Sequence, residues 1–174
     1  MRDNNPKNVL ILNCSSDLAK SLIFFREQLV IRSPIDIPEK WPSYRFRSFL
    51  PFFLENIEKK YASSFQLWIL VELDQKRMIG DILLYDKKNH PNVVNVELYF
   101  ISPTLERKYY QECVELISEK IFAQFQRTIS YMHLEVLYSD KAKIEALKTL
   151  GFHLKSCEHP YLIWSHAIHR KENS

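Results

Sequence analysis

Glycine and cysteine are both scarce in this chain of 174 residues, and each scarcity excludes a class of structure. There are two glycines, Gly80 and Gly151, so tight turns that need glycine can occur in at most two places. The three cysteines, Cys14, Cys113 and Cys157, lie far apart and lack metal-ligand spacing. Their odd number is typical of free thiols in a reducing compartment. We therefore expect a cytoplasmic protein whose cysteines are structural thiols.

A strong charge of either sign and a long hydrophobic run are also missing. The formal net charge is +3, and the lysines and arginines are scattered, which argues against a nucleic-acid partner. No window approaches about 18 uninterrupted apolar residues, so no membrane span or membrane partner is expected. The opening residues "MRDNNPKNVL" lack the apolar core of a signal peptide. The six histidines show no HxxxH or similar spacing, so no metal site is expected.

The composition is that of an ordinary soluble globular protein, with 46% hydrophobic and 26% charged residues. No internal repeat, low-complexity tract or linker interrupts the chain. A chain of this length can bury one sizeable core. We therefore expect one domain over residues 1–174.

Hydrophobic periodicity predicts the elements of the first half. Residues 9–14 are a short strand, and Ser15 and Ser16 can cap a helix that follows. The proline-rich residues 32–42 must be a loop. Apolar residues at helical spacing define the first helix (Leu18, Leu22, Phe25, Leu29) and a second one (Phe46, Phe49, Leu50, Phe53, Leu54, Ile57, Tyr61). Pro51 should mark a kink or the first turn of that second helix.

The second half reads as strands with two further helices. Residues 65–73 and 77–85 form a hairpin, and residues 93–101 form the next strand. A helix of about four turns through Val114 leads to a strand at 128–138, which predicts a parallel, right-handed crossover. A helix at 141–149 ends at Gly151 as a left-handed cap, and a final hairpin closes the chain. The result is a mixed α/β protein with about seven strands and helices on both faces.

Three motifs occur in order along the chain: "MIGD" (78–81), "YFISP" (99–103), and "DKAKI" (140–144) with "LKTLGF" (147–152). They resemble the patterns "iGdi", "Y-w-i-s-P" and "N-x-x-S-i…L-e-k-l-G-F" of the GNAT superfamily of acyl-CoA-dependent N-acetyltransferases. The resemblance covers about residues 8–168 and is strongest to the branch that includes the ribosomal-protein N-terminal acetyltransferases. It implies the GNAT fold, a mostly antiparallel sheet whose parallel fourth and fifth strands splay apart to admit pantetheine.

The family's cofactor loop, Q/R-x-x-G-x-G/A at the start of a helix, uses backbone N–H groups to hold the diphosphate of acetyl-CoA. Here it falls on Glu106, Arg107, Lys108, Tyr109, Tyr110 and Gln111. Tyr109 stands at the first glycine and Gln111 at the last small residue. Two interpretations remain open. Arg107 and Lys108 either replace the backbone cradle with side chains, or they are solvated on a loop that binds nothing.

The resemblance also implies the other site residues. Backbone amides near Phe100 or Ile101 would polarise the thioester, and Asp140 and Lys143, at the family's Asn and Ser positions, would adjoin the cofactor. Leu147 stands where some relatives carry the tyrosine that protonates the leaving thiolate. Lys143 stands where other relatives carry a catalytic serine. The resemblance therefore finds neither the serine nor the tyrosine at its usual position.

From the residues themselves, Glu97 is the best candidate for the catalytic base. It lies in an apolar strand, where burial would raise the pKa of a carboxyl, and shares a strand face with Asn95 and Tyr99. The alternative is a solvated Glu97, or one paired with Lys or Arg. Tyr99 and Tyr138 are candidates for donating a proton to the thiolate, or they are packing aromatics.

The acceptor pocket of this family lies in the N-terminal third, here "KWPSYRFRSFLPFF" (40–53). Its aromatics with Arg45 and Arg47 could hold an acidic or aromatic acceptor, or they are the core face and polar face of a helix. The implied activity is acetyl transfer from acetyl-CoA to a primary amine, either a protein N-terminus or a small amine. The alternative is a catalytically inactive GNAT-fold protein that binds or regulates, with a homodimer among the possible assemblies.

Overall fold

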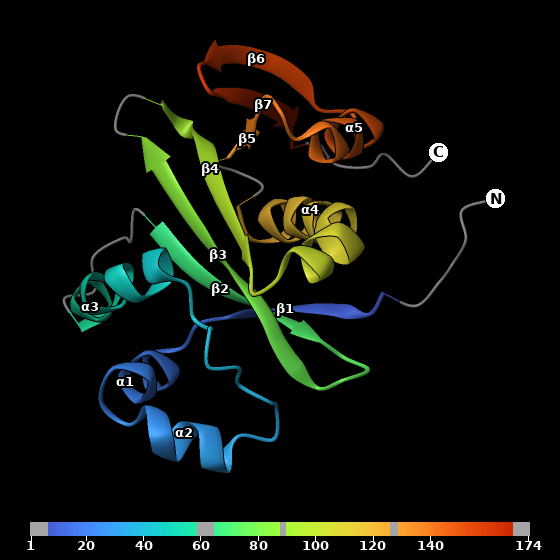
Figure 1. Ribbon diagram of the computed structural model, residues 1–174. Coiled ribbons are helices and arrows are strands. Elements are labelled where there is room, and N and C mark those ends of the chain that lie inside the picture. Colours follow the sequence, from blue (N-terminus) through green and yellow to red (C-terminus); the bar gives the residue numbers. More distant parts are fainter. Residues whose placement is uncertain (1–6, 59–64, 88–89, 126–128, 169–174) are drawn as a thin grey trace.

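The structure is a computed structural model that describes residues 7–58, 65–87, 90–125 and 129–168 (Figure 1). Its elements follow the predicted order of strands and helices. In chain order they are β1 (Val9–Asn13), α1 (Ser16–Phe24), α2 (Arg26–Arg32), α3 (Tyr44–Glu58), β2 (Phe65–Glu72), β3 (Arg77–Lys87), β4 (His90–Phe100), α4 (Pro103–Phe125), β5 (Tyr131–Leu137), α5 (Lys141–Thr149), β6 (His153–Glu158) and β7 (Tyr161–Ala167).

The strands form one mixed sheet in the order β1-β2-β3-β4-β5-β7-β6. The pairs β1–β2, β2–β3 and β3–β4 are antiparallel, and so are β5–β7 and β7–β6. Strands β4 and β5 are parallel because α4 carries the chain back between them. The predicted seven-stranded mixed sheet with one parallel pair is therefore confirmed.

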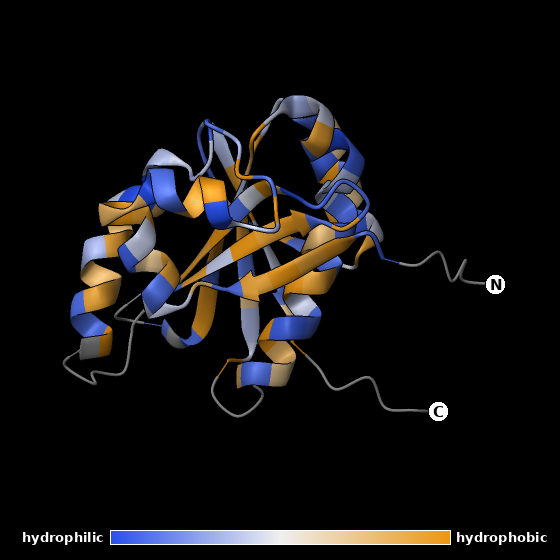
Figure 2. Ribbon diagram, turned by 90° about the horizontal axis from the view of Figure 1, so that it is seen from below, coloured by the Kyte–Doolittle hydropathy of each residue, from blue (hydrophilic) through white to orange (hydrophobic). Residues whose placement is uncertain are grey.

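Helices cover both faces of the sheet (Figure 1). Helices α4 and α5 pack on the face to which Trp68 and Leu70 of β2 point, and α1 and α3 pack on the face of Leu67 and Ile69. Figure 2 shows mostly hydrophobic strands between helices of mixed hydropathy. This is the arrangement expected of a sheet that is buried on both sides.

The first predicted helix is two helices in the structure. Ser15 caps α1 as predicted, its side chain accepting a hydrogen bond from the Leu18 N–H. The chain then breaks at Phe25 (φ −139°, ψ 36°), and α2 begins at Arg26. Phe25 is therefore 57% exposed and does not belong to the predicted buried stripe.

The second predicted helix, α3, has the expected core face. Phe46, Leu50 and Phe53 are buried, whereas Arg45 and Arg47 are exposed on its polar face. Pro51 lies inside α3 and not in its first turn. Tyr61, predicted as the end of this stripe, lies outside the described residues.

Helix α4 begins earlier than the sequence predicted. It starts at Pro103, directly after the bend at Ile101 and Ser102, and runs for 23 residues. The Ser102 hydroxyl accepts a hydrogen bond from the Leu105 N–H at 3.3 Å, and the Ser102 carbonyl accepts one from the Glu106 N–H at 3.1 Å. Ser at the cap and Pro at the first helical position are both strong start signals.

A buried carboxylate fixes the start of α3 against the sheet. Asp81 of β3 is 3% exposed and accepts two hydrogen bonds from Ser43, from its backbone N–H at 2.8 Å and its hydroxyl at 2.7 Å. The Ser43 hydroxyl in turn accepts a bond from the Phe46 N–H at 3.1 Å. Asp81 therefore positions the helix that carries Arg45.

Asp81 should make the stability of the protein depend on pH. Burial raises its pKa to about 6 from 3.8, against the hydrogen bonds from Ser43, which lower it. Its contribution to the free energy of unfolding is thus full below about pH 4 and is lost as the pH rises through about 6. Urea unfolding should show wild type losing up to roughly 3 kcal/mol relative to Asp81→Asn between pH 4 and 8. A difference between the two proteins that stays constant with pH would contradict this.

Candidate functional site

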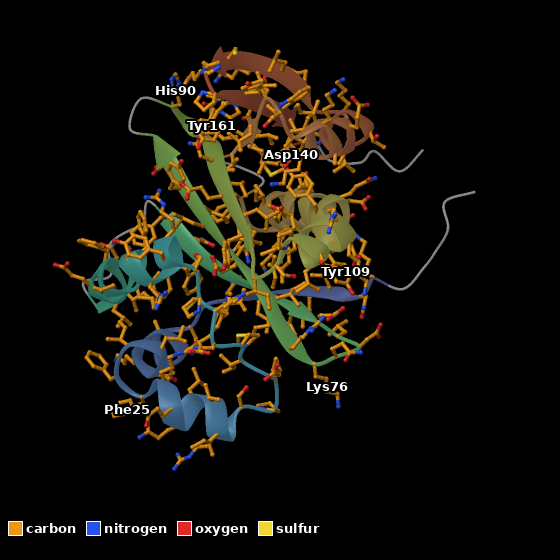
Figure 3. All side chains as sticks on the ribbon, in the orientation of Figure 1. Phe25, Lys76, His90, Tyr109, Asp140 and Tyr161 are labelled. Carbon is orange, nitrogen blue, oxygen red and sulfur yellow. The ribbon has the colours of Figure 1, made fainter. Side chains whose placement is uncertain are left out.

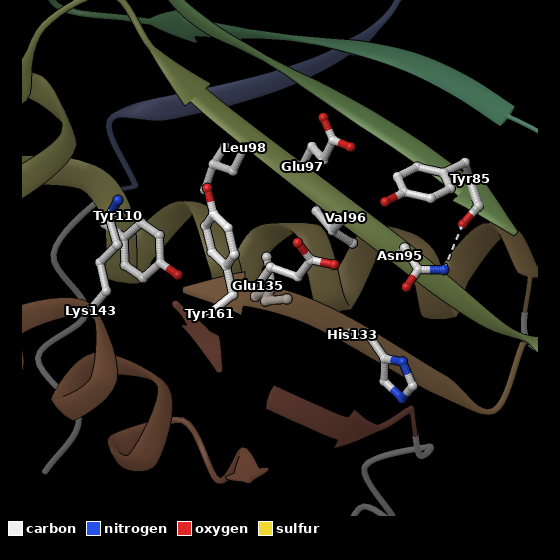
Figure 4. Close-up of a pocket in the computed structure, with 11 residues that line it drawn as sticks. Tyr85, Asn95, Val96, Glu97, Leu98, Tyr110, His133, Glu135, Lys143 and Tyr161 are labelled. Atoms are coloured by element: carbon white, nitrogen blue, oxygen red, sulfur yellow. Dashed lines mark hydrogen bonds between the residues drawn. The ribbon is translucent and has the colours of Figure 1, made fainter. Parts of the chain in front are cut away.

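The site lies where β4 and β5 separate. The two strands pair over four residues, from Val93 with Tyr131 to Val96 with Leu134. Beyond that point β4 continues beside β3, and β5 continues beside β7. A cavity of about 330 Å³ opens at this gap (Figure 4). Its lining comes from six elements: Tyr85 of β3, Asn95, Val96, Glu97 and Leu98 of β4, Tyr110 of α4, His133, Leu134 and Glu135 of β5, Lys143 of α5, and Tyr161 of β7.

Glu97, the predicted base, lies on the wall of this cavity and is bound to Arg45. The Arg45 guanidinium donates from Nε at 2.9 Å and from Nη2 at 2.7 Å, one bond to each carboxylate oxygen. The Glu97 side chain is 37% exposed and that of Arg45 57%. Pairing with arginine, one of the alternatives considered for Glu97, is therefore what the structure contains. The hydrogen bond to Glu97 raises the pKa of Arg45.

A second carboxylate, Glu135, lies on the same cavity from the neighbouring strand. Figure 4 shows its carboxylate pointing from β5 toward β4. Burial, with the nearby carboxylates of Glu97 and Glu135, raises the pKa of Tyr85 to about 12. Asn95 donates a hydrogen bond to the Tyr85 carbonyl at 3.3 Å and holds that end of the wall. The cavity thus has an acidic side on which phenols stay protonated.

The two tyrosines predicted as proton donors lie away from the described lining of the cavity. Tyr138 is 57% exposed, and its ring contacts that of His159 at 5.4 Å between centroids. Tyr99 is partly exposed at the end of β4. The phenols of Tyr110 and Tyr161 enter the cavity instead (Figure 4).

The hydrogen bonds of β4 decide which backbone amides face the gap. The Ile101 N–H donates to the Ile79 carbonyl of β3 at 2.9 Å, so it is not available to a ligand. Because N–H groups along a strand point alternately to its two sides, those of Leu98 and Phe100 point away from β3. The described pairing of β4 with β5 ends at Val96, so β5 no longer pairs with β4 at these residues. Of the two predicted amides, that of Phe100 therefore faces the gap.

The predicted cofactor loop, residues 106–111, lies entirely inside α4. Its backbone N–H groups therefore serve the helix and form no loop cradle. The Glu106 carboxylate forms an ion pair with the Lys143 ammonium at 2.7 Å, and a carboxylate oxygen of Asp140 lies 3.3 Å from the same nitrogen. Burial lowers the pKa of Lys143, but these two carboxylates outweigh it and raise the net value. The ion pair joins α4 to α5 beside the cavity.

The middle of the segment packs on the other side of α4. Tyr109 is 2% exposed and donates a hydrogen bond to Glu72, far from Tyr161 (Figure 3). Glu72 also accepts from Lys108 at 3.2 Å and from Arg77 at 2.7 Å. Burial alone would raise the pKa of Glu72, but these hydrogen bonds outweigh it and the pKa is lowered. Lys108 and Tyr109 are therefore engaged within the protein.

The outward residues of the segment are Arg107 and Gln111, which are both exposed. Within the described part of the chain, Arg107 makes no ion pair. It is the cation of the predicted segment that a ligand could reach without breaking an existing contact.

Sequence reasoning missed Tyr85, Glu135 and Tyr161. Glu135 carried a usable signal, because it is a lone carboxylate in an apolar strand just as Glu97 is. Tyr161 carried none, since its place in the cavity follows from the pairing of β7 with β5 at the end of the chain. His133 is buried beside Lys155, with 3.4 Å between their nitrogens.

Two general findings concern the part of the chain that the structure describes. No helix there is long and apolar enough to cross a membrane. Nor do three or more His, Cys, Asp or Glu side chains within those residues gather as a metal site would require.

No protein-family model matches the chain, and no curated protein matches it by sequence. Solved structures do match it. N-acetyltransferase PseH of Campylobacter jejuni has a TM-score of 0.56 at 14% identity, covering 92% of this chain and 98% of that one. Spermidine N-acetyltransferase of Vibrio cholerae has a TM-score of 0.63 at 10% identity, covering 95% and 97%. Ribosomal-protein-S5-alanine acetyltransferase of Vibrio fischeri has a TM-score of 0.60 at 11% identity, covering 94% of each chain.

At identities this low the likeness concerns the fold. The matches extend over nearly the full length of each of these proteins, and so over the whole mixed sheet of this chain with its parallel β4 and β5. The chain has the GNAT fold, as its motifs implied.

Proposed function

We propose that the protein transfers an acetyl group from acetyl-CoA to a primary amine. The observation that carries this proposal is the separation of β4 and β5 at a cavity lined by two carboxylates and three phenols. Acyl transfer to an amine needs a base, donors for the developing oxyanion and a proton for the leaving group. Proteins of similar fold are N-acetyltransferases, and PseH has been solved in complex with acetyl coenzyme A.

Each requirement has a candidate at the gap. Acetyl-CoA supplies the thioester. Glu97 takes the proton that the amine loses, since each of its oxygens keeps a lone pair beside the bond from Arg45. The N–H groups of Leu98 and Phe100 hold the carbonyl oxygen, and they are rigid because β4 is bonded to β3 along its other edge.

The acyl end and the diphosphate end of the donor meet different surroundings. In this proposal the acyl-pantetheine arm lies in the gap between β4 and β5, where one cavity is lined from Tyr110 and Lys143 to Glu97. The diphosphate lacks the glycine cradle, since residues 106–111 are helical. Arg107 is the residue that would hold it, through an exposed side chain.

Reversing the charge of Arg107 should therefore weaken the donor. We expect Arg107→Glu to raise the Kd for acetyl-CoA about tenfold, because a contact of roughly 1 kcal/mol becomes a repulsion. Calorimetric titration measures this, with Arg32→Glu on α2 as a charge-matched control away from the gap. An unchanged affinity would remove Arg107 from the donor site.

The proposal is tested first by titrating the protein with acetyl-CoA in a calorimeter, with desulfo-CoA and ADP for comparison. A micromolar dissociation constant is expected. Thiol release is then followed with spermidine, a peptide that begins with alanine, and an amino-sugar nucleotide. These acceptors represent the classes named for proteins of this fold, including the nucleotide-linked sugar enzyme FdhC. Absence of heat and of thermal shift at millimolar acetyl-CoA would contradict the proposal and favour a binding or regulatory role.

A further inference from the structure

We propose that Tyr161 of β7 is the acid that protonates the leaving thiolate. This inference rests on the acetyl transfer proposed above and names a residue for a step that the family's usual positions leave unfilled. Where some GNAT relatives carry the tyrosine that protonates the thiolate, this chain has Leu147, which is 0% exposed in the hydrophobic core. The proton must therefore come from another element.

The sheet topology brings Tyr161 to the gap. β7 pairs with β5, and Tyr161 lies opposite Leu137, three residues beyond the last contact of β5 with β4. Its side chain thus starts where β4 has left the ladder. Figure 4 shows the Tyr161 side chain pointing toward Leu98, which lines the same cavity and whose amide faces the gap. In this proposal a thioester held by that amide lies in the cavity that Tyr161 lines, with its sulfur turned toward the Tyr161 hydroxyl.

The other groups of the cavity are less suited to this step. Burial, with Asp140 and Glu106 nearby, raises the pKa of Tyr110, so it is a poorer acid than an ordinary phenol. Tyr85 lies among the carboxylates of Glu97 and Glu135, which raise its pKa together with burial. The Lys143 ammonium is held by Glu106 and Asp140. Tyr161 is 44% exposed and can recover a proton from water.

The amine nitrogen forms a bond to the carbonyl carbon, and Glu97 receives the proton that the nitrogen loses. Tyr161 gives its phenolic proton to the sulfur as the carbon–sulfur bond breaks and its electron pair stays on sulfur. The proton held by Glu97 then returns through water to the Tyr161 phenolate. An amide and a free thiol result, with no oxidant or reductant required.

Two acyl donors with different leaving groups distinguish a tyrosine that acts as an acid from one that only packs. The thiol of acetyl-CoA is a poor leaving group that needs a proton, whereas the thiophenol of S-phenyl thioacetate leaves readily without one. We expect Tyr161→Phe to lower kcat about 100-fold with acetyl-CoA, at an unchanged Kd for acetyl-CoA. With S-phenyl thioacetate, corrected for the uncatalysed reaction, the loss should shrink to less than about threefold.

Matched variants complete the test. Tyr138→Phe and Tyr131→Phe remove exposed hydroxyls of residues that do not line the cavity, and both variants should retain kcat within about fivefold. Circular dichroism confirms the fold of each variant. An equal loss with both acyl donors, or no loss with either, would overturn the role of Tyr161 alone. Transfer by wild type from neither donor to any of the three acceptors would overturn the proposed function together with this inference.

Discussion

Gly80→Ala should unfold the protein or leave it insoluble. A Cβ atom at this position would lie 2.0 Å from the backbone oxygen of Tyr99, and 3.2 Å from the Leu70 side chain. Backbone cannot move aside as a flexible side chain can, so the β3–β4 ladder would have to open. We expect a loss above roughly 4 kcal/mol, a large part of the stability of an ordinary domain. Urea unfolding of the purified variant, or its recovery in the soluble fraction, measures this.

Gly151→Ala is the matched control, because it makes the same chemical change in open space. The nearest atom to its Cβ would be His166 Cε1 at 3.9 Å, but φ is +82°, where side chains are disfavoured. A cost of about 1 kcal/mol is expected, and the protein should stay folded. If both variants lost the same amount, the close approach at Gly80 would not be the cause.

Glu97→Gln should lower kcat for acetyl transfer about 100-fold or more, the usual contribution of a general base. Glutamine has nearly the same shape but cannot accept the proton of the amine. The Kd for acetyl-CoA should not change, because in the proposed reaction Glu97 takes a proton from the amine and makes no bond to the donor. Steady-state kinetics from pH 6 to 9 would follow the loss.

Glu135→Gln provides the comparison, since it removes a carboxylate from the same cavity on the adjoining strand. A change of less than about fivefold is expected there. The reverse result, with Glu135 essential and Glu97 dispensable, would assign the base to β5. Such a result would give a function to the carboxylate that Arg45 does not hold.

The strand pattern was predictable because each strand is specified by its own apolar residues. The hairpin of β2 and β3, the parallel crossover through α4 and the left-handed cap at Gly151 all follow from local signals. The start of α4 was mispredicted because the family spacing favoured a loop at 106–111. Ser102 and Pro103 begin the helix before that segment, and they were not used as start signals.

The composition of the site was less predictable, because its contacts join distant parts of the chain. Arg45 binds Glu97 across 52 residues, and nothing in either local pattern indicates the pair. Tyr161 reaches the gap through the position of β7 beside β5. Gly80 was predicted inside the strand at 77–85, but nothing in that strand's pattern indicated the close approach between neighbouring strands that requires a glycine there.

The early start of α4 also bears on how this chain could change in evolution or by design. Glycine at positions 109 and 111 would restore the two small residues of the family's cofactor-loop pattern in the sequence. With Ser102 and Pro103 still starting the helix, those glycines would stand inside it at a cost of about 1 kcal/mol each. Residue 109 would also lose the phenol that bonds to Glu72. Restoring a phosphate loop therefore requires moving the origin of a helix, and two substitutions cannot do that.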